Sequence, residues 1–499
     1  MNLWEKYDAS FKKNASETAF CIRTRFYSYA EFSAYIRGSQ QLLLNHIGQS
    51  AGLPIGVICH DRIETYAAIF AIWFSGSYFV PLHPLHPALI NDEKVRQSGI
   101  HLIIDPEIIK PDNDLKLKCV GNKDLKSSGP LIICPETDRA YLLFTSGSTG
   151  KPKGVPINRK NLEVFIDGFL EIYPDLTSED RFLQTYDLTS DAAFTGYLIP
   201  LLLGASIYTI PAEGFKYLTI VKILQQYQIT WSQFTPSVLN YLRPYFKSIK
   251  FVSLKHSHFG GEALPYEVVK QWAECVPNAE ISNIYGPTET TITCTIHRAE
   301  SDQLLENVYN GIVSIGKPLK GVKILIINEN DQIAAEGEKG ELCIGGSQVM
   351  EGYLNDPSDI RPFFIHALNG IKKRYYRSGD LAIRDRNECL FFCGRKDDQL
   401  KISGYRIEPA EIEFAVSHLA NGSKARAYGY RNKSGTESIV VFMEQSDIQP
   451  DNLKEKLRAI LLPALIPEKI IPISQFPLNR NGKVDKSVLF EQYSSQIYE

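Results

Sequence analysis

The segment from Tyr141 to Gly154 constrains the fold most tightly, because an apolar run leads directly into a loop of small, polar and cationic residues. Positions 141–144 have the composition of a buried strand, and the next ten positions contain four hydroxyl residues, three glycines and two lysines. Glycines let the backbone approach an anion closely, hydroxyls donate hydrogen bonds and lysines supply positive charge. The segment therefore predicts a polyphosphate-binding loop. It is not a Walker A loop, because Pro152 stands where that motif requires Ser or Thr.

Helical and strand patterns alternate through the first 140 residues, which predicts a layered α/β fold. Residues 65–74 form an apolar helix candidate, residues 78–80 a strand, and apolar spacing predicts another helix near 161–170. Short strand patterns such as 322–328 dominate after about residue 310, so we expect a β-barrel-like subdomain there.

A polar stretch near residue 397 has the composition of a linker and marks the predicted domain boundary. We expect residues 1–396 to form a large N-terminal domain built of layered α/β subdomains and the β-rich part. Residues 397–499 are expected to form a small, mobile α/β domain with a helix at 409–419.

Composition and charge exclude several classes of protein. The 54 Lys and Arg nearly balance 57 Asp and Glu, a formal charge of −3, which gives no electrostatic basis for binding nucleic acid or an anionic membrane. The nine cysteines are scattered, which favours reduced thiols over a disulfide framework. The N-terminus has no apolar signal core, and the longest apolar stretch, 67–74, is too short to span a bilayer. We therefore expect a soluble, cytoplasmic protein.

Four further motifs follow the loop in chain order. They are Asn283-Ile-Tyr-Gly-Pro-Thr-Glu-Thr290, Tyr376-Arg-Ser-Gly-Asp-Leu381, Gly394–Glu408 and Pro477–Asp485. With the loop they span residues 141–485, and they resemble the motifs of the acyl-adenylate-forming superfamily, in particular its amino-acid adenylation domains. The phrase Phe259–Pro265 is most similar to the free-standing D-alanine–carrier-protein ligases. The resemblance implies a reaction in which a carboxylate and ATP give an acyl-adenylate and pyrophosphate.

The resemblance also implies which residues bind ATP and a metal. The implied ATP contacts are Thr145, Ser146, Gly147, Ser148, Thr149, Gly150, Lys151, Asn283, Ile284, Tyr285, Gly286, Pro287, Thr288, Asp380, Arg395 and Lys483. Asp380 suits the two ribose hydroxyls, because an ionised carboxylate only accepts hydrogen bonds. Magnesium bridges phosphate oxygens and uses one or two carboxylates, so Glu289 is the expected metal ligand.

Lys483 and Lys401 are the implied catalytic residues. Attack on the α-phosphate builds negative charge between two anions, and the ammonium of Lys483 is placed by resemblance to offset that charge. Asp397 resembles the hinge about which the small domain turns between adenylation and a second, thiolation step. In the second step Lys483 is expected to leave the site.

The activated acid is expected to be an amino acid. In such members of the superfamily an aspartate pairs with the α-ammonium, and the segment Tyr186–Phe194 contains Asp187 and Asp191. Counting back from Gly204 puts Asp191 in register. A buried ammonium without a partner is costly, so this one residue separates amino-acid users from users of fatty or aryl acids. The alternative is that Asp191 only caps a helix.

The same registers supply the rest of the predicted amino-acid pocket. Its wall consists of Asp191, Ala192, Thr195, Gln233, His258, Gly260, Ile284, Ile292, Thr293 and Lys483. Gly260 is expected to leave space, and Gln233 and Thr293 to offer hydrogen bonds. This wall favours a small or polar amino acid such as alanine, glycine or glutamine. The superfamily commonly has aspartate where this chain has His83; His83 and His86 form no expected metal site, because prolines interrupt the segment.

We find no carrier-domain or condensation-domain signature in the sequence. The chain therefore resembles a stand-alone enzyme that loads the phosphopantetheine thiol of a separate carrier protein. An acyl- or aryl-CoA ligase of the same superfamily is one alternative, and coenzyme A dependence would reveal it. A non-catalytic ATP-binding regulator is another, but Lys483, Glu289 and Asp380 are all present and argue against a degenerate site.

Replacing Lys483 separates the two half-reactions. Lys483→Ala is expected to slow adenylate formation by at least ~10²-fold, as loss of one charge-stabilising group does. Transfer of the acyl group from preformed adenylate should stay nearly unchanged, because Lys483 is expected to be outside the site in that step. Single-turnover measurement of each step checks this, and equal losses in both would contradict the domain alternation.

Overall fold

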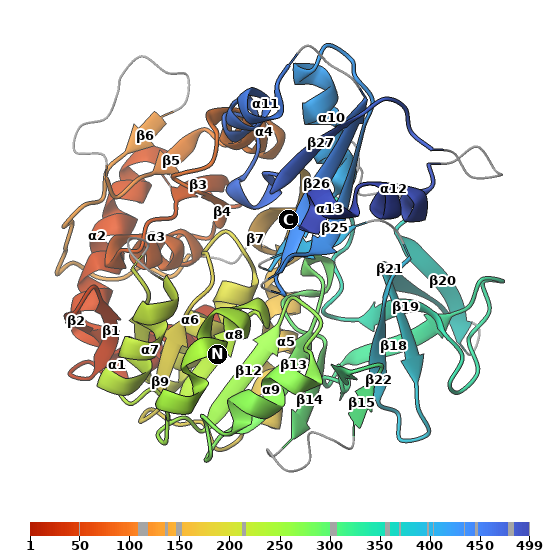
Figure 1. Cartoon of the computed structure of the whole chain (residues 1–499). Coiled ribbons are helices and arrows are strands. Elements are labelled where there is room, and N and C mark those ends of the chain that lie inside the picture. Colours follow the sequence, from red (N-terminus) through yellow and green to blue (C-terminus); the bar gives the residue numbers. More distant parts are fainter. Residues whose placement is uncertain are drawn as a thin grey trace. The chain divides into compact units, whose positions relative to one another are not determined.

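The protein is described by a computed structural model covering residues 1–48, 50–107, 118–134, 138–145, 152–211, 216–299, 307–354, 360–368, 371–396, 399–402, 404–433, 435–444, 448–477 and 484–498. The chain divides into two compact units. The larger unit comprises residues 1–84, 95–144 and 154–396, and the smaller one comprises residues 85–94, 145–153 and 397–499 (Figure 1).

Two sheets of mostly parallel strands form the framework of the larger unit. The first sheet has the order β17 (Lys317–Pro318), β14 (Thr295–Ala299), β13 (Glu280–Tyr285), β12 (His256–Gly260), β11 (Trp231–Phe234), β9 (Arg181–Gln184), β10 (Ser206–Thr209), β1 (Thr18–Ile22) and β2 (Arg25–Ser28). The second has the order β6 (Lys118–Val120), β5 (Leu102–Ile104), β3 (Pro54–Ile58), β4 (Tyr78–Leu82), β7 (Arg139–Thr145) and β8 (Lys153–Asn158). The strands from β13 to β1 run parallel, as do those from β6 to β7.

Helices connect these strands, as parallel pairing requires. They are α1 (Leu3–Lys13), α2 (Tyr29–Ile47), α3 (Ile63–Phe74), α4 (Ala88–Ser98), α5 (Arg159–Ile172), α6 (Ala192–Leu203), α7 (Lys216–Gln226), α8 (Ser237–Leu242), α9 (Tyr266–Ala273) and the 3-10 turns η1 (Arg243–Ser248) and η2 (Thr288–Thr290). Polar N-caps define the starts of α1 and α2, where Asn2 and Ser28 each form a capping box.

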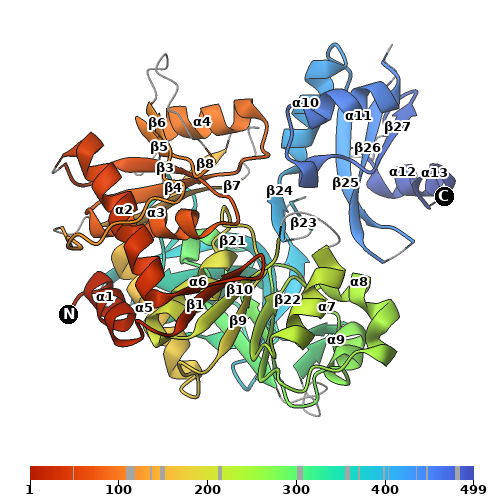
Figure 2. The same ribbon diagram turned by 90° about the vertical axis from the view of Figure 1, so that its left-hand side faces the viewer.

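Two of these helices, α3 and α6, lie between the two sheets (Figure 2). Every residue of α3 is buried, and a helix that is apolar all round must be covered on all sides. Its Tyr66 ring lies 4.7 Å from Phe20 of the first sheet, while Trp73 Nε1 donates to a carbonyl of β7 in the second. Helix α6 packs on β9 and β10, and its Phe194 ring lies 4.6 Å from Tyr141 of β7. Both helices are therefore fixed from two sides.

The β-rich part of the larger unit is formed by antiparallel strands. They are β15 (Val308–Tyr309) with β16 (Ile312–Val313), and a five-stranded sheet in which β18 (Val322–Ile327), β19 (Gly340–Gly346), β21 (Ile371–Arg384) and β20 (Phe363–Leu368) are in order and β22 (Leu390–Arg395) pairs with β21. This confirms the α/β fold with a β-barrel-like part that the sequence predicted.

The smaller unit contains its own mixed sheet. The elements of this unit are β23 (Leu400–Ile402), β24 (Tyr405–Ile407), α10 (Pro409–Leu419), β25 (Ala425–Arg431), β26 (Glu437–Glu444), α11 (Pro450–Arg458), the 3-10 turn η4 (Pro463–Leu465), β27 (Lys469–Ile473), α12 (Lys486–Gln492) and α13 (Ser494–Tyr498). Strands β23 and β24 form a separate two-stranded sheet. Strand β26 pairs antiparallel with β25 and parallel with β27, while α10 packs on β25 and α11 on β27. The helix predicted at 409–419 is confirmed; the hinge and the mobility of this unit stay predictions.

No helix within the described ranges is long and apolar enough to cross a membrane.

Two helical glycines offer a matched test of packing in the larger unit. A Cβ added at Gly38 in α2 would lie 2.3 Å from the carbonyl oxygen of Leu125, whereas one at Gly168 in α5 would lie at ordinary contact distance, 3.5 Å from the nearest atom. Gly38→Ala is therefore expected to lower the free energy of unfolding by about 1–3 kcal/mol through overpacking. Gly168→Ala should be neutral or stabilising by up to ~1 kcal/mol, because alanine favours helix.

Thermal and urea unfolding of both variants measure this difference. A Gly38→Ala protein as stable as wild type would show that α2 is free to move away from the segment containing Leu125.

Candidate active site

Several predicted site residues of the larger unit follow the ends of parallel strands in the first sheet, whose strands β9, β12 and β13 are labelled in Figure 1. Strands β9, β11, β12 and β13 all point the same way, so their carboxyl ends share one edge. Ligands of open α/β sheets bind at this edge, because the loops that follow the strands are free to vary there. The loops after β9 and β13 carry Asp191 and Glu289, respectively.

Asp380, which is predicted to contact ribose, is a buried carboxylate at the start of the β21–β22 pairing. Asp380 is 1% exposed, and it accepts from Tyr285 Oη at 2.6 Å on one oxygen and from Arg395 Nη1 at 2.8 Å on the other. Burial, together with the neighbouring Asp380 charge, raises the pKa of Tyr285, so its hydroxyl stays a donor. Gly379 has a φ of 70°, a conformation that favours glycine, and a Cβ there would lie 2.7 Å from the Arg395 guanidinium. The structure thus brings together three of the predicted ATP-binding residues.

The stretch between Asn283 and Thr288 is held in place by the protein itself. The Asn283 amide donates to the carbonyls of Val313 and Ser314, both at 3.0 Å, and Asn283 is 2% exposed. A Cβ at Gly286 would lie 2.4 Å from the carbonyl oxygen of Ile292. The backbone after β13 therefore folds back closely upon itself.

Two aspartates lie in the loop between β9 and α6, and the structure distinguishes them. Asp187 accepts from the backbone and hydroxyl of Thr189, both at 2.7 Å, and lies 2.7 Å from His83 Nε2. Burial opposes ionisation of Asp187, yet the hydrogen bonds and charge of His83, together with Thr189, outweigh it and lower its pKa. Asp187 is therefore an ionised group that is already satisfied.

Asp191 has a different environment. It occupies the N-cap position of α6, but its side chain makes no capping hydrogen bond, and its Oδ2 is buried with no hydrogen-bond partner among the described residues. Burial raises the pKa of Asp191 to about 7, and the negative charge of nearby Glu289 adds to the effect. Hydrogen bonds from the Thr288 side chain and the Ile292 backbone lower the pKa of Asp191, but they do not outweigh burial. A buried carboxylate in this state requires a cation or a proton.

The wall beside Asp191 is formed by strand ends in register. Gln233 of β11 pairs with His258 of β12, and Gly260 of β12 pairs with Ile284 of β13. A Cβ at Gly260 would lie 2.6 Å from Ile284 Cγ1. The expectation that Gly260 leaves space is therefore wrong, because the Ile284 side chain occupies that volume.

His258 lies deep in the wall, with no exposed surface. Its ring lies 4.9 Å from those of Trp231 and Tyr173, and burial lowers its pKa well below the usual value, so the imidazole is neutral. Several buried polar atoms of the wall have no hydrogen-bond partner within the described part of the chain: Thr195 Oγ1, Gln233 Oε1 and both ring nitrogens of His258. The predicted wall thus contains buried polar atoms that are unpaired within the described ranges, and Ile284 packs closely against Gly260. Ala192, Ile292 and Thr293 complete the described members.

Glu289 is the only predicted metal ligand. It is fully buried, and its Oε1 accepts from Tyr353 Oη at 2.9 Å. Among the residues that the structure describes, no group of three or more His, Cys, Asp or Glu could hold a metal ion. Magnesium held mainly by phosphates needs only one or two protein carboxylates. Glu289 fits an ion that arrives with a nucleotide, and it does not fit a site built of protein ligands alone.

Several predicted residues fall outside the described residues. Ser146 to Lys151 of the phosphate loop, the hinge residue Asp397 and the catalytic Lys483 are among them. Thr145 ends β7, and its Oγ1 is buried without a hydrogen-bond partner in the described ranges. Lys401 lies on β23 of the smaller unit.

Sequence reasoning missed the segment that holds the turn after β13. Gln348 and Tyr353 contact this turn, but neither lies in a periodic pattern or in a quoted motif. The only signal for His83 was its departure from the aspartate common in the superfamily; in the structure its Nε2 lies 2.7 Å from Asp187.

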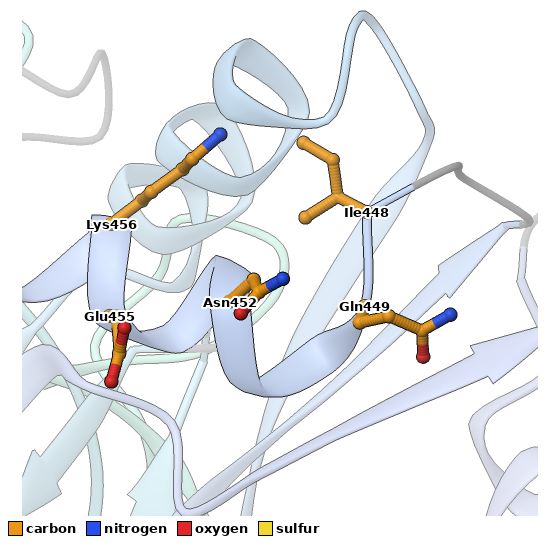
Figure 3. A pocket seen from close by; sticks show the side chains of 5 residues that line it. All are labelled: Ile448, Gln449, Asn452, Glu455 and Lys456. Atoms are coloured by element: carbon orange, nitrogen blue, oxygen red, sulfur yellow. The ribbon is translucent and has the colours of Figure 1, made fainter.

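A hollow on the smaller unit is no alternative site. It is lined by Ile448, Gln449, Asn452, Glu455 and Lys456, at and around the start of α11 (Figure 3). All five residues are described, and none of them contains one of the buried unpaired polar atoms that mark the wall beside Asp191.

Known proteins share this architecture. The AMP-binding enzyme family matches residues 7–354. Zwittermicin A synthase ZmaJ of Bacillus cereus is 28% identical, over 97% of this chain and 93% of ZmaJ. Gramicidin S synthase 2 of Aneurinibacillus migulanus is also 28% identical over 98% of this chain, but the chain spans only 11% of that synthase.

Solved structures agree with the sequence relatives. The Vibrio cholerae adenylation domain AlmE, in complex with glycyl-adenosine-5'-phosphate, has a TM-score of 0.85 at 26% identity, covering 99% of this chain and 98% of AlmE. Holo-PA1221, a nonribosomal peptide synthetase protein with adenylation and PCP domains, has a TM-score of 0.85 at 25% identity, covering 98% and 84%. The chain therefore belongs to the AMP-binding enzyme family within the acyl-adenylate-forming superfamily, and it is an ATP-dependent adenylating domain of the nonribosomal peptide synthetase type.

Proposed function

We propose that this protein activates a small or polar amino acid as aminoacyl-AMP and transfers it to the phosphopantetheine thiol of a separate carrier protein. The observation that carries the proposal is the buried Asp191 carboxylate, whose Oδ2 has no partner among the described residues. The α-ammonium of an amino acid supplies the missing charge and hydrogen bond. A fatty or aryl acid has no cation there and would leave the carboxylate unpaired.

Close packing around the predicted wall supports a small substrate side chain. Ile284 fills the volume over Gly260, and a Cβ at Gly196 of α6 would lie 2.9 Å from Gln184 Oε1. Helix α6 and the strand ends therefore lie close together beside Asp191. The relative AlmE, whose structure contains a glycyl adenylate, supports a substrate of this size.

The chemistry assigned to the site has two steps. In the first, an oxygen of the amino-acid carboxylate attacks the α-phosphorus, the bond to the β-phosphate oxygen breaks, and pyrophosphate leaves. In the second, the thiol sulfur attacks the acyl carbon, the bond to the phosphate oxygen breaks, AMP leaves, and the thiol proton passes to solvent. Asp380 holds the ribose, and Lys483 stabilises charge at the α-phosphate. Magnesium, when bound through Glu289, neutralises phosphate charge.

The carrier as acceptor is supported by PA1221, in which adenylation and PCP domains occur in one protein. The competing acceptor is coenzyme A. Thioester formation with coenzyme A, without dependence on an amino acid, would favour the acyl- or aryl-CoA ligase.

Amino-acid-dependent ATP–pyrophosphate exchange is the direct test. The panel is the twenty L-amino acids, D-alanine, β-alanine and representative aryl and fatty acids, and we expect a response from one or a few small or polar amino acids. Asp191→Asn should reduce the response at least ~10²-fold, since it removes the charge paired with the substrate ammonium and leaves that ammonium buried.

Asp180→Asn is the matched control, because Asp180 is also buried but lies just before β9, where Thr177, Thr230 and Lys255 donate hydrogen bonds to it. Exchange only with aryl or fatty acids, or full exchange by Asp191→Asn, would contradict the proposal.

The raised pKa of Asp191 also predicts how stability depends on pH. The ordinary value is 3.8 and the folded value is about 7, so between about pH 4 and 7 the native protein keeps a proton that the unfolded chain has released. The stability supplied by this proton is full below about pH 4 and is lost as the pH rises to about 7. Asp191→Asn cannot ionise, so relative to wild type it should gain stability over this interval and keep a constant advantage above it.

Thermal midpoints of wild type and Asp191→Asn at pH 5, 6, 7 and 8 measure the effect. Asp180→Asn should give a pH-independent difference over the same range: burial opposes ionisation of Asp180, but Thr177, Thr230 and Lys255 outweigh it and lower its pKa from the ordinary 3.8. The stability supplied by its charge is full above about pH 4 and is lost only at lower pH, so the deficit of this variant should stay constant from pH 5 to 8. Midpoints of Asp191→Asn that parallel wild type at every pH would show that Asp191 is solvated.

A further inference from the structure

The turn after β13 contains two consecutive residues in the left-handed region. Thr291 has a φ of 61° and Ile292 a φ of 67°. Both side chains are branched at Cβ, and such residues adopt positive φ only where the surrounding structure holds them there. The turn therefore needs an external restraint.

Gln348 provides that restraint. Its side-chain Nε2 donates to the carbonyls of Thr293 at 2.8 Å, Thr291 at 3.2 Å and Thr290 at 3.3 Å, and the residue has no exposed surface. In addition, Thr291 Oγ1 donates to the backbone carbonyl of Gln348 at 2.6 Å. One side-chain amide group thus forms hydrogen bonds with three backbone carbonyls of the strained turn.

The residues that follow Gln348 extend the same contact. The backbone N–H of Met350 donates to the Glu289 carbonyl at 2.9 Å, and Tyr353 Oη donates to Glu289 Oε1 at the same distance. Residues 348–353 therefore hold the turn from Glu289 to Thr293 along its length.

The turn carries residues of both the proposed metal site and the proposed amino-acid wall. Glu289 is the metal ligand of the proposed function, and Ile292 and Thr293 belong to the amino-acid wall. The backbone of Ile292 and the side chain of Thr288 also form hydrogen bonds with Asp191. A shift of this turn would therefore displace the carboxylate and the wall together.

We infer that Gln348 is a positioning residue, which holds the strained turn so that Glu289 meets the metal and Ile292 and Thr293 meet the substrate amino acid. The inference rests on the proposed function. Misplacement of reacting groups by about 1 Å can cost ~10²-fold in rate, so loss of this restraint should be felt in catalysis as well as in stability.

The chain contains a matched control for a merely structural glutamine. Gln40 of α2 is 2% exposed, and its amide donates to the Ile132 carbonyl and accepts from the Ile132 N–H. Gln40 thus restrains a loop of the larger unit as Gln348 does, but no predicted site residue lies on that loop. Methionine is close in size to glutamine and lacks its amide donor. Gln348→Met and Gln40→Met therefore each remove the side-chain amide hydrogen bonds that restrain the turn and the loop, respectively.

The test compares both variants with wild type in the full-length protein. Hydrogen–deuterium exchange mass spectrometry follows the peptides that span 286–296 and 129–135. Steady-state ATP–pyrophosphate exchange, with the amino acid that responds in the panel above, gives KM for the amino acid and the magnesium concentration for half-maximal rate.

Gln348→Met is expected to speed deuterium uptake in 286–296, raise the amino-acid KM and the magnesium requirement together, and lower kcat/KM by about 10²-fold. Gln40→Met is expected to speed uptake only in 129–135 and to leave both kinetic parameters unchanged. Unchanged uptake in 286–296 on loss of Gln348, or faster uptake with unchanged kinetics, would overturn the inference. If wild type responds to no amino acid, the proposed function fails, and deuterium uptake alone then decides whether Gln348 holds the turn.

Discussion

A carboxylate buried at the amino end of α6 sets the conditions for the rest of the site. Asp191 is attached to a helix that packs on β9 and β10 on one side and on Tyr141 of β7 on the other. Because both sides of α6 are covered, the helix cannot carry the charge out to water without separating a strand layer. The cost of the buried charge is therefore removed only by a proton or by a bound cation. This explains why burial raises the pKa of Asp191, whereas hydrogen bonds and the charge of His83 lower the pKa of Asp187 four residues earlier.

A second carboxylate in the same region makes the two ligands of the proposed reaction interdependent. The charge of Glu289 raises the pKa of Asp191, so each acid makes the other more costly to ionise. A cation that pairs with one of them reduces the penalty on the other. On the proposed function, the amino-acid ammonium and the magnesium that accompanies ATP should therefore bind with positive coupling, and the coupling must be equal in both directions. The restraint of the turn by Gln348 keeps Glu289 where this coupling can act.

The sequence predicted the fold better than its packing. Apolar patterns located α3 and α5, and the helix expected at 409–419 is α10. Parallel strands place their carboxyl ends on one edge, so residues that follow β9 and β13 fall near each other there. What it missed depends on contacts between segments far apart in the chain. The space over Gly260 is filled by Ile284 from the neighbouring strand, and the donors of Gln348 reach a turn more than fifty residues earlier. Periodicity carries no information about such contacts.

The contact between His83 and Asp187 shows why the choice between two nearby aspartates could not be made from composition. Asp191 is buried and Asp187 is partly buried, and burial alone raises the pKa of both. The difference lies in their partners: His83, at the end of the second sheet, and Thr189 satisfy Asp187, whereas Asp191 keeps an oxygen without a partner within the described ranges. On the proposed function, a substrate ammonium therefore gains more by pairing with Asp191 than with Asp187. A histidine at position 83 adds no negative charge to this region, so on that proposal Asp191 is the acid that the substrate neutralises.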